Sequence, residues 1–192
     1  MKAKKVLALV LCAALLVAGS VAATLAYLMS TDTVTNTFTV GKVVITLDEA
    51  EVDLYGDEVE GADRRDNNQY KLIPGHNYKK DPIIHVEAGS EKCYLFAKIE
   101  NGLGSDATIN GMTGWTAIAE GSNVYYYAQV VDAGAAAQDV TVFTDFTFGA
   151  EANPETHKDH SIVVTAYAVQ YDGFESGAVA AWNATYGKPA NS

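Results

Sequence analysis

Cysteine is scarce in this chain of 192 residues, which contains only Cys12 and Cys93. Cys12 lies inside a long apolar run at the N-terminus, so a chain that loses this run keeps a single thiol and forms no internal disulfide. Cys93 alternates with Leu95, Ala97 and Ile99, which predicts a thiol on the buried face of a strand. An exposed, intermolecular thiol is the alternative.

Basic residues are also few, with 13 Lys and Arg against 24 Asp and Glu. Three of the lysines, Lys2, Lys4 and Lys5, belong to the N-terminal segment, so a chain without residues 1–26 carries a formal charge of −14. Nucleic acid is excluded as a partner because phosphates need basic residues. The same charge argues against electrostatic binding to an anionic membrane surface.

The motifs of the common catalytic sites are missing. The sequence contains neither His-Glu-x-x-His nor Gly-x-Ser-x-Gly, and no calcium loop or phosphate-binding glycine loop. No catalytic or cofactor-binding residue and no cofactor are therefore assigned. The only metal-ligand candidates are weak: His157 and His160 lie three residues apart in a loop, and His76 or His85 would have to join them from elsewhere.

The first 26 residues have the organisation of a secretory signal peptide. The three lysines precede an apolar run over residues 6–18, and small residues follow. Cleavage after residues 21–23 or after residues 24–26 both fit; the second site, between Ala26 and Tyr27, is preferred. An uncleaved membrane anchor is the alternative, because about 20 apolar residues span a bilayer. The chain is thus expected to be secreted, with any membrane contact only through an uncleaved signal segment.

Residues 27–37 follow the signal and are interpreted as a leader. This leader alternates Thr with apolar residues, lacks proline and carries one charge, Asp32. Such a segment can pair through its backbone with the edge strand of a neighbour. A plain first strand or a flexible leader is the alternative. The proposed assembly strand comprises Tyr27, Met29, Thr31, Thr33, Val34, Thr35 and Thr37.

Strand signals dominate the remainder, which is divided into a domain over residues 38–187 and a tail over residues 188–192. β-branched and aromatic residues at period two predict strands over residues 43–47, 82–86, 93–100, 115–119, 123–131, 140–148 and 161–171. Asn101-Gly102 predicts a hairpin. Helix is expected only over residues 177–186 and in a short turn after Glu49, and residues 55–69 are expected to be an exposed loop. The fold class is all-β, an antiparallel jelly-roll sandwich of two sheets with short peripheral helices; an immunoglobulin-like sandwich is second.

Three stretches resemble the TasA/camelysin family. The first runs from Thr24-Leu25-Ala26-Tyr27 to Val43-x-Ile45-x-Leu47, the second covers residues 70–86, and the third covers residues 163–182. The resemblance implies a jelly-roll subunit that a dedicated signal peptidase of the SipW type cuts before Tyr27. It also implies self-association, or association with a related subunit, into fibres of the bacterial biofilm matrix or cell surface, in which one N-terminal segment completes the sheet of the next subunit.

Two other functions stay open at this point. A camelysin-like metalloprotease requires some of the four histidines to converge. A surface-anchored binding module for a glycan or protein is suggested by Trp115 and residues 125–127. The resemblance alone does not supply catalysis, so enzymatic activity is left undecided with a preference against it.

Overall fold

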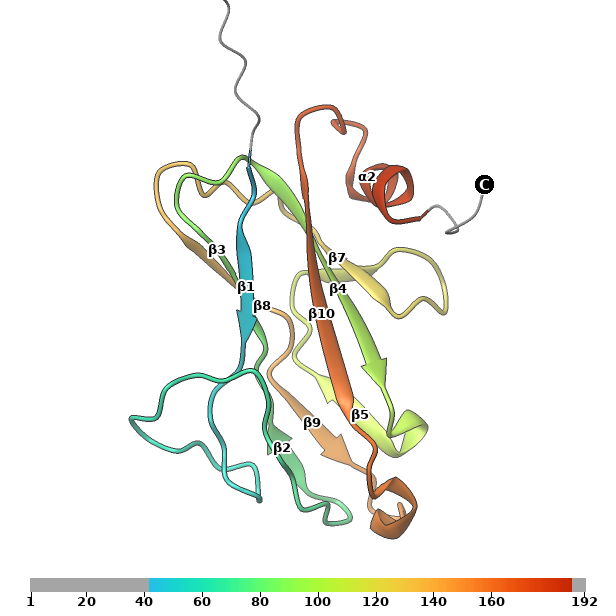
Figure 1. Cartoon of the computed structure of the whole chain (residues 1–192). Helices are drawn as coiled ribbons and strands as arrows, with labels where there is room; N and C mark the ends of the chain where they lie inside the picture. Colours follow the sequence, from blue (N-terminus) through green and yellow to red (C-terminus); the bar gives the residue numbers. More distant parts are fainter. Residues whose placement is uncertain (1–41, 188–192) are drawn as a thin grey trace, which may run out of the picture. The chain divides into compact units, whose positions relative to one another are not determined.

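The computed structural model describes residues 42–187. The signal peptide, the Ala26–Tyr27 junction, the leader, residues 38–41 of the expected domain and the tail lie outside these residues. The regular secondary structure of the described part is mostly strand, joined by long loops (Figure 1). Its strands are β1 (Ile45–Asp48), β2 (Asn77–Lys79), β3 (Ile83–Val86), β4 (Cys93–Asn101), β5 (Ala107–Asn110), β6 (Trp115–Ala117), β7 (Val124–Tyr127), β8 (Gln138–Thr141), β9 (Asp145–Phe148) and β10 (Ile162–Gln170).

The strands form three antiparallel sheets, which confirms the all-β class. The orders are β1-β3-β8, β10-β4-β7-β6 and β2-β9-β5. Two sheets were expected and three are found among the described residues. The helices are short: two 3-10 turns, Gly104–Asp106 and Pro154–His157, and α2 (Ala178–Thr185), which lies within the expected range of residues 177–186.

The main core lies between the first two sheets. Its fully buried members include Ile84, Val86, Leu95 and Phe143. Cys93 is buried there too, as expected, and desolvation raises the pKa of its thiol to about 11. The thiol is therefore a small apolar side chain of the core and not a nucleophile.

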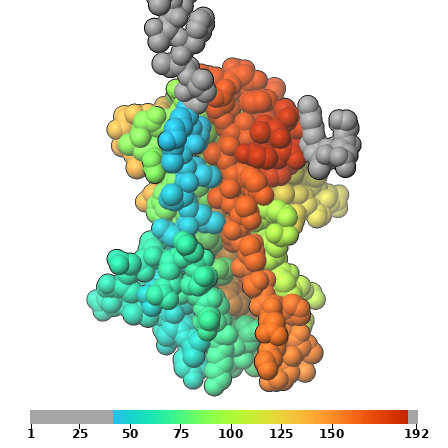
Figure 2. All heavy atoms as spheres, in the orientation of Figure 1, coloured from blue at the N-terminus to red at the C-terminus, as the bar shows by residue number. Residues whose placement is uncertain are grey.

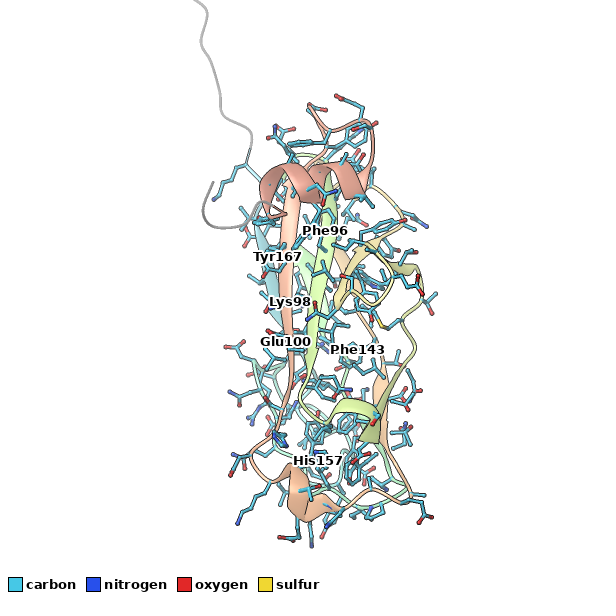
Figure 3. The ribbon with its side chains drawn as sticks, turned by 90° about the vertical axis from the view of Figure 1, so that its right-hand side faces the viewer. Phe96, Lys98, Glu100, Phe143, His157 and Tyr167 are labelled. Atoms are coloured by element: carbon cyan, nitrogen blue, oxygen red, sulfur yellow. The ribbon has the colours of Figure 1, made fainter. Side chains whose placement is uncertain are left out.

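The four-stranded sheet is covered on its second face by α2. The even-numbered residues Tyr94 and Phe96 of β4 are buried like the odd-numbered ones, but they pack toward the helix. Figure 3 shows Phe96 and Tyr167 close to α2, and the ring of Trp182 lies 5.1 Å from Phe96 and 5.2 Å from Tyr167. β4 is thus a central strand covered on both faces.

The hairpin prediction at Asn101-Gly102 is wrong. The strand after this turn, β5, pairs with β9, whereas β4 pairs with β7 and β10. The Asn101 side chain accepts a bond from Leu103 N–H and donates to Gly104 O and Ala107 O, so it satisfies the following backbone locally. Gly102 meanwhile donates to Ser161 O and continues the ladder to β10.

Residues 140–148 form two strands and not one. Val142 and Phe143 are adjacent and both fully buried, which breaks the period of two. The chain leaves β8, which pairs with β3, and enters β9, which pairs with β2 and β5. Thr144, which an unbroken period of two places on the same face as Val142, is exposed at this break.

No helical turn follows Glu49. The segment stays extended because Ala50 N–H donates to Asp81 Oδ1 at 2.8 Å and Val52 N–H donates to Asn68 Oδ1 at 3.1 Å. Residues 55–69 form the expected irregular loop, which two isolated bridges, Glu49 with Arg65 and Val52 with Glu58, attach to this segment.

Candidate assembly edge

Two neighbouring strands, β1 and β10, each have one unpaired edge. Among the described residues β1 pairs only with β3, and β10 pairs only with β4. The two strands nevertheless lie side by side along one face of the domain (Figures 1 and 2). We call them the β1–β10 edge pair. No ladder joins the two strands of the pair within residues 42–187.

The backbone of β1 presents free hydrogen-bonding groups at this edge. Glu87 N–H donates to Val44 O at 3.0 Å, which continues the β1–β3 register and makes the even-numbered residues of β1 the ones bonded to β3. Bonding direction alternates along an antiparallel strand. Ile45 and Leu47 therefore direct their N–H and C=O groups away from β3.

The same reasoning applies to β10. Gly102 N–H donates to Ser161 O at 2.9 Å and Tyr171 N–H donates to Lys92 O at 2.7 Å, so the odd-numbered residues are bonded to β4. The groups of Ile162, Val164, Ala166 and Ala168 point to the free edge. An incoming strand would find regularly spaced donors and acceptors there.

The side chains at the edge pair leave the main core incompletely covered. The inward-facing residues of both strands pack against the main core but are only partly buried, in contrast to their counterparts on β3 and β4. These residues are Val43, Ile45, Leu47, Ile162, Val164, Ala166 and Ala168. A strand laid along this edge would remove apolar surface from water while it paired the backbone groups.

An ionic network fixes the end of β1. Asp48 accepts from Arg64 Nε at 2.5 Å and from His85 Nε2 at 3.0 Å, and His85 Nδ1 lies 2.7 Å from Asp139 on β8. Burial alone lowers the pKa of His85, but the two carboxylates outweigh it and raise this pKa. Burial by itself raises the pKa of Asp48, but the hydrogen bonds and charges of Arg64 and His85 outweigh it, so the pKa of Asp48 is lowered. The network crosses all three strands of the first sheet.

Replacing His85 with Gln is expected to lower stability in a pH-dependent way. Because the pKa of His85 is raised in the folded state, its contacts contribute stability that is fully present below pH 6.5, the ordinary pKa of histidine. This contribution is lost as the pH rises through the pKa of His85 in the folded protein. Because the pKa of Asp48 is lowered in the folded state, its stability contribution is present above pH 3.8, the ordinary pKa of aspartate, and is lost as the pH falls through the folded-state pKa. The deficit in free energy of unfolding should be largest between pH 3.8 and 6.5, and at most about 1 kcal/mol because the site is partly exposed.

Urea unfolding of both proteins across this pH range measures the deficit. His76→Gln is the matched control, since His76 Nε2 bonds only the backbone carbonyl of Tyr55, at 2.8 Å. If His85→Gln lowered the free energy of unfolding equally below and above neutral pH, the stabilising role given to the charged His85 would be contradicted.

The four histidines do not converge on a metal site. His157 donates from Nε2 to Asp106 Oδ2 at 2.8 Å, and its ring lies 5.5 Å from that of His160. His76 and His85 are engaged with the other partners named above. Within residues 42–187 no group of three or more His, Cys, Asp or Glu side chains is placed to hold a metal ion. The structure thus brings together only the His157–His160 pair of the four candidates.

The aromatic residues considered for a binding module belong mainly to the sheet. Trp115 is buried and donates from Nε1 to Thr141 O at 2.9 Å, and residues 125–127 are partly buried on β7. The assembly residues Tyr27, Met29, Thr31, Thr33, Val34, Thr35 and Thr37 and the cleavage residues Ala26 and Tyr27 lie outside the described residues. The sequence predicts a donor segment but not its acceptor, because an edge is defined only once every strand is paired.

No model of a known protein family, no curated protein and no solved structure matches the chain. In the part of the chain that the structure describes, no helix has the length and apolar character needed to cross a membrane. The function is therefore inferred from the residues and their geometry.

Proposed function

We propose that this chain is a secreted structural protein, a subunit of extracellular biofilm-matrix or cell-surface fibres assembled by N-terminal strand addition. The observation that carries the proposal is the β1–β10 edge pair, where unpaired backbone edges coincide with a partly covered main core. The proposed finer fold is a jelly-roll sandwich in which the sheets β1-β3-β8 and β10-β4-β7-β6 enclose this core. The resemblance to the TasA/camelysin family supports both statements.

The leader is suited in length and chemistry to this edge. Residues 27–37 extend over about 36 Å at roughly 3.3 Å per residue, and β10 has 9 residues, about 30 Å by the same spacing. The leader has no proline to interrupt the ladder and only one charge, Asp32. Its threonines are suited to a half-exposed strand surface. One leader thus suffices to follow the whole of β10.

Assembly requires that the leader adds to another subunit. Only residues 38–44 separate the leader from β1. A leader that folds back through Gly41 onto its own β1 closes the edge and gives monomers, whereas a leader donated to a second copy gives a chain of subunits. Electron microscopy of residues 27–192 beside residues 38–192 distinguishes these outcomes.

The remaining parts of the proposal concern export. Removal of residues 1–26 by a dedicated signal peptidase frees the leader at Tyr27, so that assembly begins outside the cytoplasm of a bacterium. An uncleaved signal would instead hold the subunit at the membrane. Mass spectrometry of the N-terminus of the natural protein tests this step: a first residue other than Tyr27 would move the cleavage site.

Assembly should depend on pH and salt. The secreted chain carries a formal charge of −14, so its subunits repel one another at neutral pH. Lowering the pH to about 5 or adding about 0.15 M salt reduces this repulsion and should speed assembly, which light scattering follows over time. A series of buffers at different pH but constant ionic strength separates the effect of pH from that of salt. Rates that respond to neither change would contradict the electrostatic part of the proposal.

A further inference from the structure

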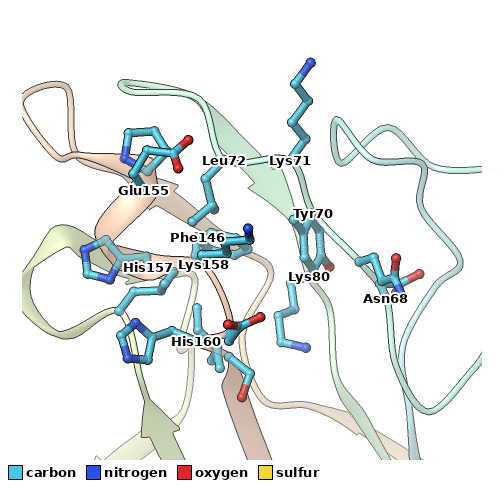
Figure 4. Close-up of a pocket in the computed structure, with 16 residues that line it drawn as sticks. Asn68, Tyr70, Lys71, Leu72, Lys80, Phe146, Glu155, His157, Lys158 and His160 are labelled. Carbon is cyan, nitrogen blue, oxygen red and sulfur yellow. The ribbon is translucent and has the colours of Figure 1, made fainter.

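A cavity of about 730 Å³ lies between two irregular segments beside the third sheet (Figure 4). Residues 68–72 form one wall, and residues 154–162 form the other. Phe146 of β9 and Leu103 contribute to the floor. The volume falls in the range of small-molecule sites, which is about 300–1,000 Å³.

The floor is apolar and only partly covered. Phe146 and Leu103 belong to the core of the third sheet and are almost fully buried, whereas Tyr70, Leu72 and Ile162 pack on them with part of their surface open. The rings of Tyr70 and Phe146 meet edge to face at 5.3 Å. An aromatic or branched apolar group of a ligand can extend this stack.

The second wall combines backbone strain with an unsatisfied polar atom. Asp159 has φ of 91°, and it is the only residue other than glycine with positive φ in residues 42–187. Beside it, His157 Nε2 lies 2.8 Å from Asp106 Oδ2, and its other ring nitrogen, Nδ1, is buried with no hydrogen-bond partner among the described residues. Strain and unsatisfied buried groups concentrate at binding sites.

Of the three lysines that line the cavity, Lys71 and Lys158 form no ion pair among the described residues. Lys80 is paired with Glu49, and Lys71 lies over the ring of Tyr55 at 5.7 Å. Lys158 forms no ion pair within the described residues, although Glu155 and Asp159 also line the cavity. Lys158 and Phe146 both line the cavity, and both are labelled in Figure 4.

We propose that this cavity binds a small organic carboxylate with an aromatic or branched apolar body. The body lies on Tyr70, Leu72 and Phe146, and the carboxylate pairs with Lys158. The charge-assisted bond to Lys158 is stronger than a neutral hydrogen bond, and the apolar floor gains by burying the body of the ligand. The site is separate from the β1–β10 edge pair and does not depend on fibre assembly.

Calorimetric titration of residues 27–192 with 3-phenylpropionate tests the proposal. We expect saturable binding, and binding about tenfold weaker for the neutral 3-phenylpropionamide, which lacks the charge-assisted bond. Lys158→Gln should weaken binding of the carboxylate by about the same factor. Lys92→Gln is the control, because Lys92 is an exposed lysine paired with Asp132 and lies outside the cavity.

A second variant tests the apolar floor. Leu72→Ser should weaken the carboxylate and the amide equally, since it removes apolar contact and leaves the charge in place. The proposal is overturned by equal affinities for carboxylate and amide, by tighter binding of 3-phenylpropylamine, by an unchanged affinity in Lys158→Gln, or by no saturable binding up to about 10 mM ligand, which corresponds to under 3 kcal/mol.

Discussion

A chain that begins at Phe38 is expected to remain monomeric under conditions in which residues 27–192 form filaments. Without the leader, the chain keeps the unpaired edges of β1 and β10 but lacks the proposed donor strand. Each backbone hydrogen bond of an added strand contributes about 0.5–1.5 kcal/mol net, and association opposes it with about 4–15 kcal/mol of lost freedom. Removing the whole donor strand should therefore abolish assembly and not merely slow it. Negative-stain microscopy and light scattering measure the difference.

A proline at the acceptor edge provides the complementary test. Val164→Pro removes an N–H that points away from β4, so the β4–β10 ladder stays intact while the free edge is blocked. Thr141→Pro is the matched control, since Val142 N–H donates to Pro82 O and the N–H of Thr141 therefore faces the free edge of β8. The proposed acceptor edge is contradicted if Val164→Pro still forms filaments, or if only Thr141→Pro loses them. Circular dichroism confirms that each variant is folded.

Most strands of this domain can be predicted from local sequence because period-two alternation survives in them. β10 and β4 are the best cases: both were expected within one or two residues of their observed bounds. α2 was found from the small and apolar residues before Trp182. The residue types of these three elements agree with their final structure, which is the condition under which propensity is informative, although burial does not alternate along β4 because both of its faces are covered.

The errors arise where distant partners decide the structure. Asn101-Gly102 has the residues of a hairpin turn, but Gly102 N–H donates a hydrogen bond to Ser161 O, and β5 pairs with β9 instead of β4. The alternation across residues 140–148 looks continuous, yet Val142 and Phe143 are both drawn into the main core and the chain changes sheets there. A local turn motif or an alternating pattern cannot predict such a change of sheet, because the change depends on which distant strand pairs with the segment.

The candidate site illustrates the same limit. The residues of the leader predict a donor strand, whereas the proposed acceptor edge depends on β1 and β10, which are over 100 residues apart in the chain and lie side by side with unpaired edges. The network at the end of β1 likewise joins Asp48, Arg64 and Asp139 through His85. Charged loop residues such as Arg64 look like solvated surface until the fold places a carboxylate beside them.

The second large effect is expected at a buried ion pair that joins the segment after β1 to the segment after β2. The Lys80 ammonium donates to the Glu49 carboxylate, and their side chains are only 11% and 5% exposed. Asn68 Nδ2 donates to the same carboxylate at 3.0 Å. Lys80→Met leaves Glu49 as an uncompensated buried charge, which should lower the free energy of unfolding by about 3–5 kcal/mol. Chemical unfolding of residues 27–192 at a concentration below the onset of assembly measures this loss.

The neighbouring lysine supplies the control for this prediction. Lys79 pairs with Glu58, but here the side chains are 38% and 55% exposed, so Lys79→Met should change stability by at most about 1 kcal/mol. Adding Glu49→Met to Lys80→Met removes the orphaned charge and should recover most of the loss, because apolar replacements of a whole buried pair are often neutral. A double variant as unstable as Lys80→Met would mean that Lys80 acts through its packing, and that the charge of Glu49 is stabilised by Asn68 and the surrounding backbone.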